Sequence, residues 1–281
     1  MGPGHPECPE RLEEILKYLE KNLKYEEVEP SLASDADLLL VHTKKHIENL
    51  EKLSALGRSF PDNAFSKETY SISKLAAGAA LEAAMLSGSS FSFALVRPPG
   101  HHAGKDFFAG FCYLNNMAFA VRKMQSLGKA KKALIVDFDL HHGNGTQDIF
   151  KDDPSVFYLS LNQDPVFTYP GSGFESENNL HIRNVVVQEG ATENEYIQAF
   201  ESSLAESVVS HKPDLIGVSA GFDTYGLDQI GSKIRIFHSS LYNELGKAIK
   251  NCGVPTFGTL EGGYYLPALG ENVYQFLKAF E

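Results

Sequence analysis

The stretch ALIVDFDLHHGNG, residues 133–145, joins a run of apolar residues directly to carboxylates and imidazoles. The apolar run has the length and composition of a buried strand. Asp137, Asp139, His141 and His142 follow it at once. Such groups are costly to bury unless they are paired or bind a metal. The stretch therefore predicts a strand that ends at a functional site, and a metal is one explanation for its polar groups.

Similar short runs recur on both sides of this strand and alternate with helical patterns. The runs FSFALV, VFYLSL, IRNVVV, LIGVSA and VPTFGTL occupy residues 91–96, 156–161, 182–187, 215–220 and 254–260. Helical patterns cover residues 115–128, 193–211, 239–253 and 268–280, and the first 88 residues are helical in pattern, including a segment after Pro9 and residues 74–86. This alternation predicts an α/β fold with an open, mostly parallel sheet and helices on both faces.

Composition excludes several classes of protein. The formal net charge of −11 argues against a general binder of nucleic acid or anionic membranes, because such partners need a basic face. The three cysteines, Cys8, Cys112 and Cys252, are widely spaced and suggest neither a disulfide framework nor a cysteine zinc site. No signal peptide or membrane span is recognisable. We expect one cytoplasmic domain over residues 1–281, since no repeat or linker divides the chain.

Polar residues follow four of the predicted strands. RPPGHHAG, DFDLHHGNG, GFDTYG and EGGYY each come directly after an apolar run. Taken singly, each has a plain structural explanation: His101 and His102 could line a turn, and Asp223 could cap the next segment. Because the carboxyl ends of parallel strands meet at one edge of a sheet, the four runs together predict one binding or catalytic site there.

The residue types indicate a metal site. In an extended continuation of the strand, Asp137, Asp139 and His141 share one face, and the intervening apolar residues point into the core. Asp139, His141 and Asp223 form a set of nitrogen and oxygen ligands without sulfur. This set suits a catalytic Zn²⁺ with an open position for water, or Fe²⁺ as an alternative. Asp137 is left over and could orient a histidine.

Six motifs carry a resemblance to a known family. RPPGHHA, GFCYLNN, VDFDLHHGNGTQ, YPGSG, GFDTYGLD and EGGY, in this order, resemble the histone deacetylase and acetylpolyamine amidohydrolase family, within the arginase/deacetylase fold. GHPECPERL resembles the family's opening loop and first helix, so the resemblance covers nearly the whole chain. The chain begins at this loop, without the strand that precedes it in the family. Asn144 stands where class I members carry Asp, which indicates a class II-like or bacterial member.

The resemblance also implies roles for single residues. It implies a zinc ion held by Asp139, His141 and Asp223, with His101 and His102 beside the metal-bound water. His102 would act as general base and acid, oriented by Asn144, and His101 would pair with Asp137. Tyr264 would stabilise the transition state. Further implied residues are Phe111, Tyr169, Gly110 and Ile230 at the substrate channel, Arg11 at the exit for acetate, and a structural K⁺ site formed by Ser160 and the backbone carbonyls of Asp137, Asp139, His141 and Leu161.

The activity implied is the zinc-dependent removal of acetyl groups from acetyl-lysine in proteins or peptides. Acetylated polyamines and other small acetylated amines remain alternative substrates. An arginase-like binuclear manganese hydrolase would need additional aspartate ligands, and the His101–His102 pair with Tyr264 speaks against it. A catalytically silent binding protein would usually have lost a metal ligand or the tyrosine, and none of these is lost here.

Overall fold

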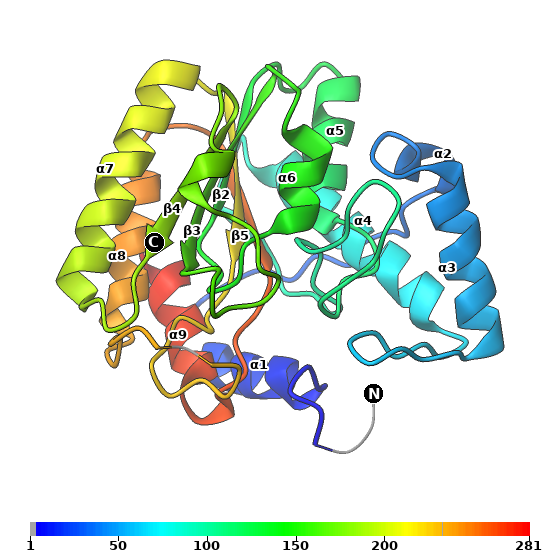
Figure 1. Ribbon diagram of the computed structural model, residues 1–281, viewed down its shortest axis with the longest axis horizontal. Helices are drawn as coiled ribbons and strands as arrows, with labels where there is room; N and C mark the ends of the chain where they lie inside the picture. Colours follow the sequence, from blue (N-terminus) through cyan, green and yellow to red (C-terminus); the bar gives the residue numbers. More distant parts are fainter. Residues whose placement is uncertain (1–3, 232) are drawn as a thin grey trace.

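The computed structural model describes residues 4–231 and 233–281, so the first three residues and Ser232 lie outside it. Within this part the strands form one sheet in the order β1-β6-β5-β2-β3-β4, and every neighbouring pair is parallel (Figure 1). The strands are β1 (Ser92–Ala94), β2 (Ala133–Asp137), β3 (Val156–Gln163), β4 (Ile182–Val187), β5 (Leu215–Ala220) and β6 (Thr256–Leu260). Each predicted run is thus a strand, and the predicted parallel sheet is confirmed.

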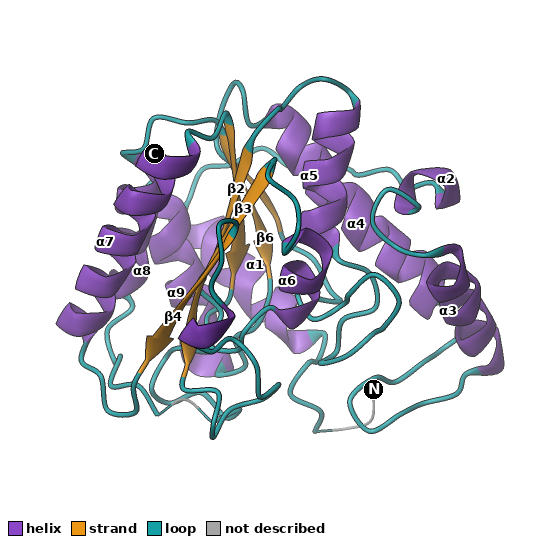
Figure 2. Cartoon of the chain, turned by 45° about the horizontal axis from the view of Figure 1, so that its top comes forward, coloured by secondary structure: helices purple, strands orange, loops and turns teal. Residues whose placement is uncertain are grey.

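Helices cover both faces of the sheet. One face carries α4 (Thr69–Leu86), α5 (Asn116–Ser126) and α6 (Asn144–Phe150), and the other carries α1 (Glu10–Asn22), α7 (Glu193–His211), α8 (Ser240–Lys250) and α9 (Leu266–Lys278) (Figures 1 and 2). The short α2 (Asp35–Leu38) and α3 (Lys44–Leu56) lie outside α4, and a 3₁₀ turn, η1, spans Glu175–Glu177. No helix in the described residues has the length and apolar character needed to cross a membrane.

The central strand β2 is buried on both sides. Ala133 and Ile135 belong to the apolar cluster under α4 and α5. Leu134 and Val136 belong to the cluster under α7, α8 and α9. A parallel strand between two helical layers has no polar face, which explains the uninterrupted apolar run at residues 133–136.

The chain leaves the sheet earlier than the sequence predicted. β2 ends at Asp137, residues 139–141 form a bend, and α6 begins at Asn144. The expected extended continuation to His141 is therefore wrong, because the N–H groups of Asp139 and His141 donate to the side chains of Asp137 and Asp139 and turn the chain. Phe138 and Leu140 nevertheless point into the apolar cluster under α7–α9, as expected. The bend leaves the polar side chains between them at the carboxyl edge of the sheet.

Candidate active site

Asp139, His141 and Asp223 meet at the carboxyl edge of the sheet. One ligand atom from each lies within 4.8 Å of the others, and all three side chains are buried. Asp139 and His141 follow β2, and Asp223 follows the neighbouring strand β5. The two strands therefore bring residues far apart in the sequence into one cluster, which is the set that the sequence predicted.

Backbone amides orient the two carboxylates. The Gly262 N–H donates to Oδ2 of Asp139 at 2.8 Å, and the Leu140 N–H donates to Oδ1 of Asp223 at 2.9 Å. The other oxygens, Asp139 Oδ1 and Asp223 Oδ2, lie 3.2 and 2.9 Å from Nδ1 of His141. A Cβ on Gly262 would come within 2.5 Å of Asp223 Oδ2, so the backbone has to approach this closely without a side chain.

This donor set fits a divalent metal ion. Two buried carboxylates share a single imidazole nitrogen, and burial together with Asp139 raises the pKa of Asp223 to about 7. Burial opposes the charge of His141, but the hydrogen bonds that its ring donates to Asp139 and Asp223 raise its pKa to about 10. Carboxylate oxygens and imidazole nitrogens are zinc ligands, and three protein ligands that leave a fourth position open for water are typical of a catalytic zinc site. A metal ion would compensate the buried negative charge better than one shared proton does.

Two histidines from the loop after β1 lie beside this cluster. The centres of the His101 and His102 rings are 4.0 Å apart, and both side chains are buried. His101 Nδ1 lies 3.1 Å from Oδ2 of Asp137, and His102 Nδ1 lies 2.8 Å from Oδ1 of Asn144. The structure thus pairs each histidine with the partner that the sequence assigned to it.

The two histidines differ in charge. Burial opposes protonation of His101, but Asp139 and Asp137 raise its pKa to about 10, so it is charged at neutral pH. Burial and the neighbouring rings of His101 and His141 lower the pKa of His102 well below its usual value. With its Nδ1 donating to Asn144, a neutral His102 has a free lone pair on Nε2. His102 can accept a proton, and His101 supplies positive charge.

Tyr264 is held between two charged residues. Its backbone N–H donates to Oδ2 of Asp228 at 2.6 Å, and the Tyr265 N–H donates to the same oxygen at 2.9 Å. The guanidinium of Arg11 lies 4.7 Å from the centre of the Tyr264 ring. Burial raises the pKa of Tyr264 well above its usual value, so its hydroxyl keeps its proton. Asp228 was not assigned a role from the sequence, because a backbone partner leaves no local pattern.

Two of the predicted channel residues, Tyr169 and Gly110, lie next to His102, and Phe111 lies next to Tyr264. The Tyr169 ring centre lies 5.0 Å from that of His102, and the Phe111 ring centre lies 6.1 Å from that of Tyr264. Gly110 has a φ of +50°, and a Cβ there would lie 2.3 Å from the His102 ring. Ile230 is half-buried, and its N–H donates to Oδ1 of Asp228 at 3.0 Å. Its place at the channel stays a prediction.

Arg11 is fully buried, and its guanidinium lies over the Tyr264 ring. Its guanidinium donates to the backbone oxygens of Gly263 and Glu261 at 2.7 and 2.6 Å, and to Oε1 of Glu7 at 3.3 Å. Glu7 also accepts a hydrogen bond of 2.5 Å from Arg97. Glu7 and Arg97 line a cavity of about 310 Å³. Arg11 does not line this cavity itself and contacts its wall through the hydrogen bond to Glu7.

Comparison with known proteins assigns the chain to a protein family. The sequence profile of the histone deacetylase domain matches residues 5–280. The chain belongs to the histone deacetylase family. This deacetylase is 35% identical over 289 residues to a probable deacetylase of Methanothermobacter thermautotrophicus, with 99% of this chain and 86% of that protein covered.

Two solved structures resemble this deacetylase closely. The HD domain of HDA15 has a TM-score of 0.93 at 33% identity, covering 100% of this chain and 86% of that chain. The acetylpolyamine aminohydrolase from Burkholderia pseudomallei has a TM-score of 0.89 at 26% identity, covering 98% and 91%. The predicted family, fold and amide-hydrolysing activity are confirmed, and the family is zinc-dependent in general.

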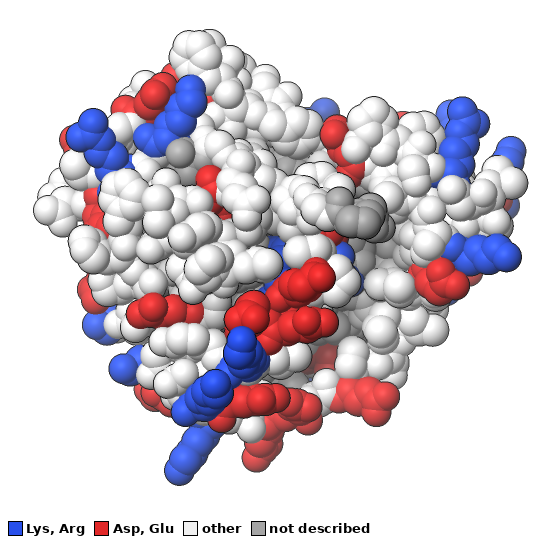
Figure 3. All heavy atoms as spheres, turned by 90° about the horizontal axis from the view of Figure 1, so that it is seen from below, with Lys and Arg blue, Asp and Glu red and all other residues white. Residues whose placement is uncertain are grey.

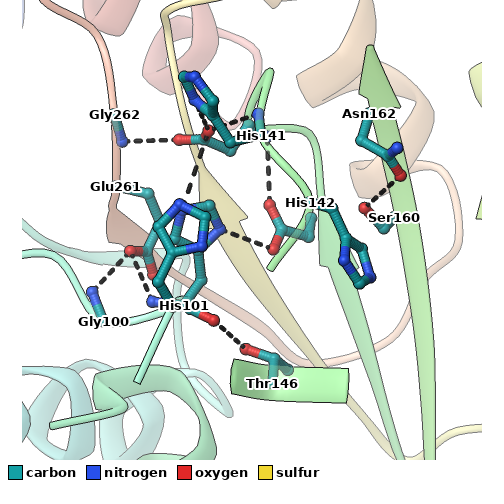
Figure 4. A network of polar contacts seen from close by, with 12 residues as sticks. Gly100, His101, His141, His142, Thr146, Ser160, Asn162, Glu261 and Gly262 are labelled. Atoms are coloured by element: carbon teal, nitrogen blue, oxygen red, sulfur yellow. Dashed lines mark hydrogen bonds and ion pairs between the residues drawn. The ribbon is translucent and has the colours of Figure 1, made fainter. Parts of the chain in front are cut away.

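The residues of the predicted potassium site lie next to the segment of this deacetylase that carries Asp137, Asp139 and His141. Ser160 on β3 is the register partner of Asp137 on β2, and its Oγ donates to Oδ1 of Asn162 at 3.2 Å (Figure 4). Leu161 is buried in the core. Potassium binding by these residues stays a prediction.

Glu261 was missed from the sequence, where EGGY indicated only Tyr264. Its Oε2 accepts hydrogen bonds from the Gly100 and His101 N–H groups at 2.7 and 3.1 Å (Figure 4). Burial raises the pKa of this carboxyl to about 7. The only sequence signal was an acidic residue at the end of a buried strand.

Proposed function

We propose that this deacetylase removes acetyl groups from acetyl-lysine side chains of peptides or proteins, with one zinc ion held by Asp139, His141 and Asp223. The observation that carries the proposal is the placement of two aromatic rings at the site: Tyr169 lies beside His102 and His141, and Phe111 lies beside Tyr264. Narrow aromatic walls suit the apolar stem of an acyl-lysine, with the polar amide at the bottom of the site.

The histidine pair would move the proton during hydrolysis. A zinc ion bound by the three ligands supplies a Lewis acid that polarises the amide carbonyl and activates water. His102 is neutral and takes a proton from the attacking water at Nε2, then delivers it to the leaving amine. His101 is charged and stabilises the negative charge that develops nearby in the transition state. Asn144 keeps the His102 ring in the tautomer that this role requires.

Tyr264 would stabilise the developing charge on the carbonyl oxygen. Its hydroxyl is protonated, so it can donate a hydrogen bond as that oxygen becomes negative. Arg11 fixes the Tyr264 segment through the Gly263 carbonyl. We place the exit of acetate beside Arg11, as the family resemblance implies. A K⁺ ion beside Ser160 would add rigidity to the loop that carries Asp139 and His141. Fe²⁺ is an alternative to zinc in the metal cluster.

Acetylated polyamines are the second candidate substrates, because an acetylpolyamine aminohydrolase has nearly the same fold. Figure 3 looks from below, onto the end of the molecule at which the strands finish, and acidic side chains gather near the middle of this face. Negative charge attracts basic peptides and polyamines alike. Charge therefore does not decide between the two substrates, and a direct comparison is needed.

The test compares kcat/KM for acetyl-lysine peptides with that for N-acetylputrescine and N-acetylspermidine, in the same buffer and with the same metal. We expect the peptides to be preferred. A preference of about tenfold or more for the polyamines, roughly 1.4 kcal/mol, would overturn the substrate assignment.

Elemental analysis tests the metal in parallel. We expect close to one zinc ion per chain and its loss in Asp223→Ala, because this change removes one of three protein ligands. Two tightly bound transition-metal ions per chain would contradict the mononuclear site.

A further inference from the structure

We propose that Glu261 is a positioning residue, whose carboxylate fixes the backbone from which the catalytic histidines project. This inference rests on the roles proposed above for His101 and His102. Glu261 does not face the reacting atoms in this proposal. It acts through two hydrogen bonds to consecutive backbone amides of the histidine loop.

The His101 peptide segment is held from both sides. On one side Oε2 of Glu261 accepts from the N–H groups of Gly100 and His101 (Figure 4). On the other side the His101 carbonyl accepts from the Thr146 N–H at 3.1 Å, in the first turn of α6. These contacts leave the main chain at His101 little room to shift. The direction in which both imidazoles leave the backbone is fixed as a result.

Glu261 is itself anchored to the centre of the sheet. It directly follows β6, its N–H donates to the Ala220 carbonyl of β5 at 2.9 Å, and its carbonyl accepts from Arg11 at 2.6 Å. Its Oε1 accepts from the Thr259 hydroxyl at 3.3 Å. Asp223 lies three residues beyond Ala220 in the same segment. Through Glu261, the histidines are therefore positioned relative to the strands that carry the metal ligands.

The geometry requires the length of a glutamate. One carboxylate oxygen reaches two successive amides, and the Glu261 side chain is fully buried. Leaving these amides without an acceptor would cost stability and let the loop move. Because a misplacement of about 1 Å at a catalytic group can cost about 100-fold in rate, a small shift of this loop should be visible in kcat.

Two variants separate the hydrogen bonds from the charge. Glu261→Gln removes the charge but keeps an oxygen at the same distance, so it can still accept from both amides. Glu261→Asp keeps the charge but is one methylene shorter. We expect Glu261→Asp to lower kcat about 10- to 100-fold, with KM and zinc content nearly unchanged, and Glu261→Gln to retain most of the wild-type kcat.

A matched control comes from the opposite end of the sheet. Asp214 accepts hydrogen bonds from the N–H groups of Lys131 and Lys132 at 3.0 and 3.1 Å, where β2 and β5 begin. Asp214→Ala therefore removes a carboxylate that also holds two consecutive amides, but far from the site. We expect it to leave kcat unchanged. A merely structural role for Glu261 would make its variants behave like this control.

Hydrogen exchange gives a readout that needs no activity. In Glu261→Asp the amides of residues 100 and 101 should exchange faster than in the wild type, and in Glu261→Gln they should not. The proposal is overturned if folded, zinc-loaded Glu261→Asp keeps the wild-type kcat, or if Glu261→Gln loses as much as Glu261→Asp.

His102→Ala separates this inference from the proposed mechanism. If His102→Ala is inactive and Glu261→Asp is not impaired, only the role of Glu261 fails. If His102→Ala keeps its activity, the proposed role of the histidine fails, and the role of Glu261 fails with it.

Discussion

Adjacent histidines have opposite electrostatic environments in this site. His101 faces Asp137 and is charged, whereas His102 faces the neutral amide of Asn144 and is uncharged. Both rings are buried, and the difference arises from the neighbouring charges: Asp139 and Asp137 raise the pKa of His101, whereas the rings of His101 and His141 add to burial in lowering the pKa of His102. The two imidazole side chains are chemically identical, but their different surroundings give them separate roles.

Tyr264 offers a direct test of transition-state stabilisation. In Tyr264→Phe the ring and its contacts with Arg11 and Phe111 remain, but the hydroxyl is lost. We expect kcat to fall by about 100-fold or more with unchanged zinc content, because one preorganised donor to an oxyanion typically contributes this much. Steady-state kinetics and metal analysis of the same sample check this. A wild-type kcat would remove Tyr264 from the mechanism.

His42 should make the fold sensitive to acid. Its Nδ1 lies 2.9 Å from the Gly104 carbonyl, and its Nε2 accepts from the Asn115 N–H at 3.0 Å, so the ring is neutral. Burial lowers its pKa from 6.5 to about 3. The unfolded chain binds a proton at a higher pH than the folded protein does. The stability contributed by neutral His42 is therefore complete above about pH 6.5 and is lost as the pH falls toward 3.

Urea unfolding at several pH values measures this contribution. Between pH 7 and pH 5, His42 alone should lower the free energy of unfolding by about 2 kcal/mol. His42→Gln can keep both hydrogen bonds without titrating, so its stability should fall less over the same range. Parallel stability curves for the two proteins would contradict the assignment.

Residues were predictable where their chemistry is local. Asp139 and His141 stand two positions apart after an apolar strand, and Asp223 closely follows another strand, so the metal cluster could be proposed from the sequence. Roles for Glu261 and Asp228 could not be proposed, because each side chain accepts hydrogen bonds from backbone amides that are far away in the sequence. Tertiary hydrogen bonds to the main chain leave no residue pattern.

At the scale of elements, the strands were predictable and one helix was not. The strands are buried and rich in apolar residues, so composition alone indicates them. α6 has only seven residues, NGTQDIF, which is too short for a helical period to stand out. It is defined instead by its neighbours, since Asn144 contacts His102 and Thr146 contacts His101. The bend that precedes α6 was missed as well, because it depends on local hydrogen bonds from the N–H groups of Asp139 and His141 to the side chains of Asp137 and Asp139.

The loop between β3 and β4, which carries Tyr169, is stabilised by hydrogen bonds to one glutamate, Glu177. Oε1 of Glu177 accepts from the N–H groups of Gly173 and Phe174 at 2.9 and 3.1 Å, and Oε2 accepts from Gln147 of α6 at 2.6 Å. In Glu177→Ala we expect KM for acetyl-lysine peptides to rise about fivefold, because about 1 kcal/mol of loop order is lost, with little change in kcat. Steady-state kinetics measure this split. A lower kcat at unchanged KM would place the loop in the chemical step instead.

At the scale of the whole molecule, the metal cluster ties together distant parts of the chain. Asp139 and Asp223 come from separate strands, and Gly262 beyond a third strand orients one of them. Because these ligands meet only in the folded state, zinc should stabilise the whole protein. At about 100-fold excess over its Kd, a bound ion adds about 2.7 kcal/mol, which corresponds to several degrees in Tm.

Thermal unfolding with and without a chelator tests this stabilisation. We expect the wild type to melt at a lower temperature once zinc is removed, and Asp223→Ala to show almost no response to the metal. Equal melting temperatures of the loaded and stripped wild type would mean that the cluster does not bind zinc tightly.

The strand order has a consequence for how the protein is made. Within the described residues β1 pairs with β6 alone, although β1 ends at residue 94 and β6 begins at residue 256. A ribosome needs on the order of ten seconds to synthesise the intervening chain. During that time β1 and the histidine loop have been made, but the strand that completes the sheet has not. We therefore expect the nascent chain to stay open, and catalytic competence to arise only after the last strand has left the ribosome.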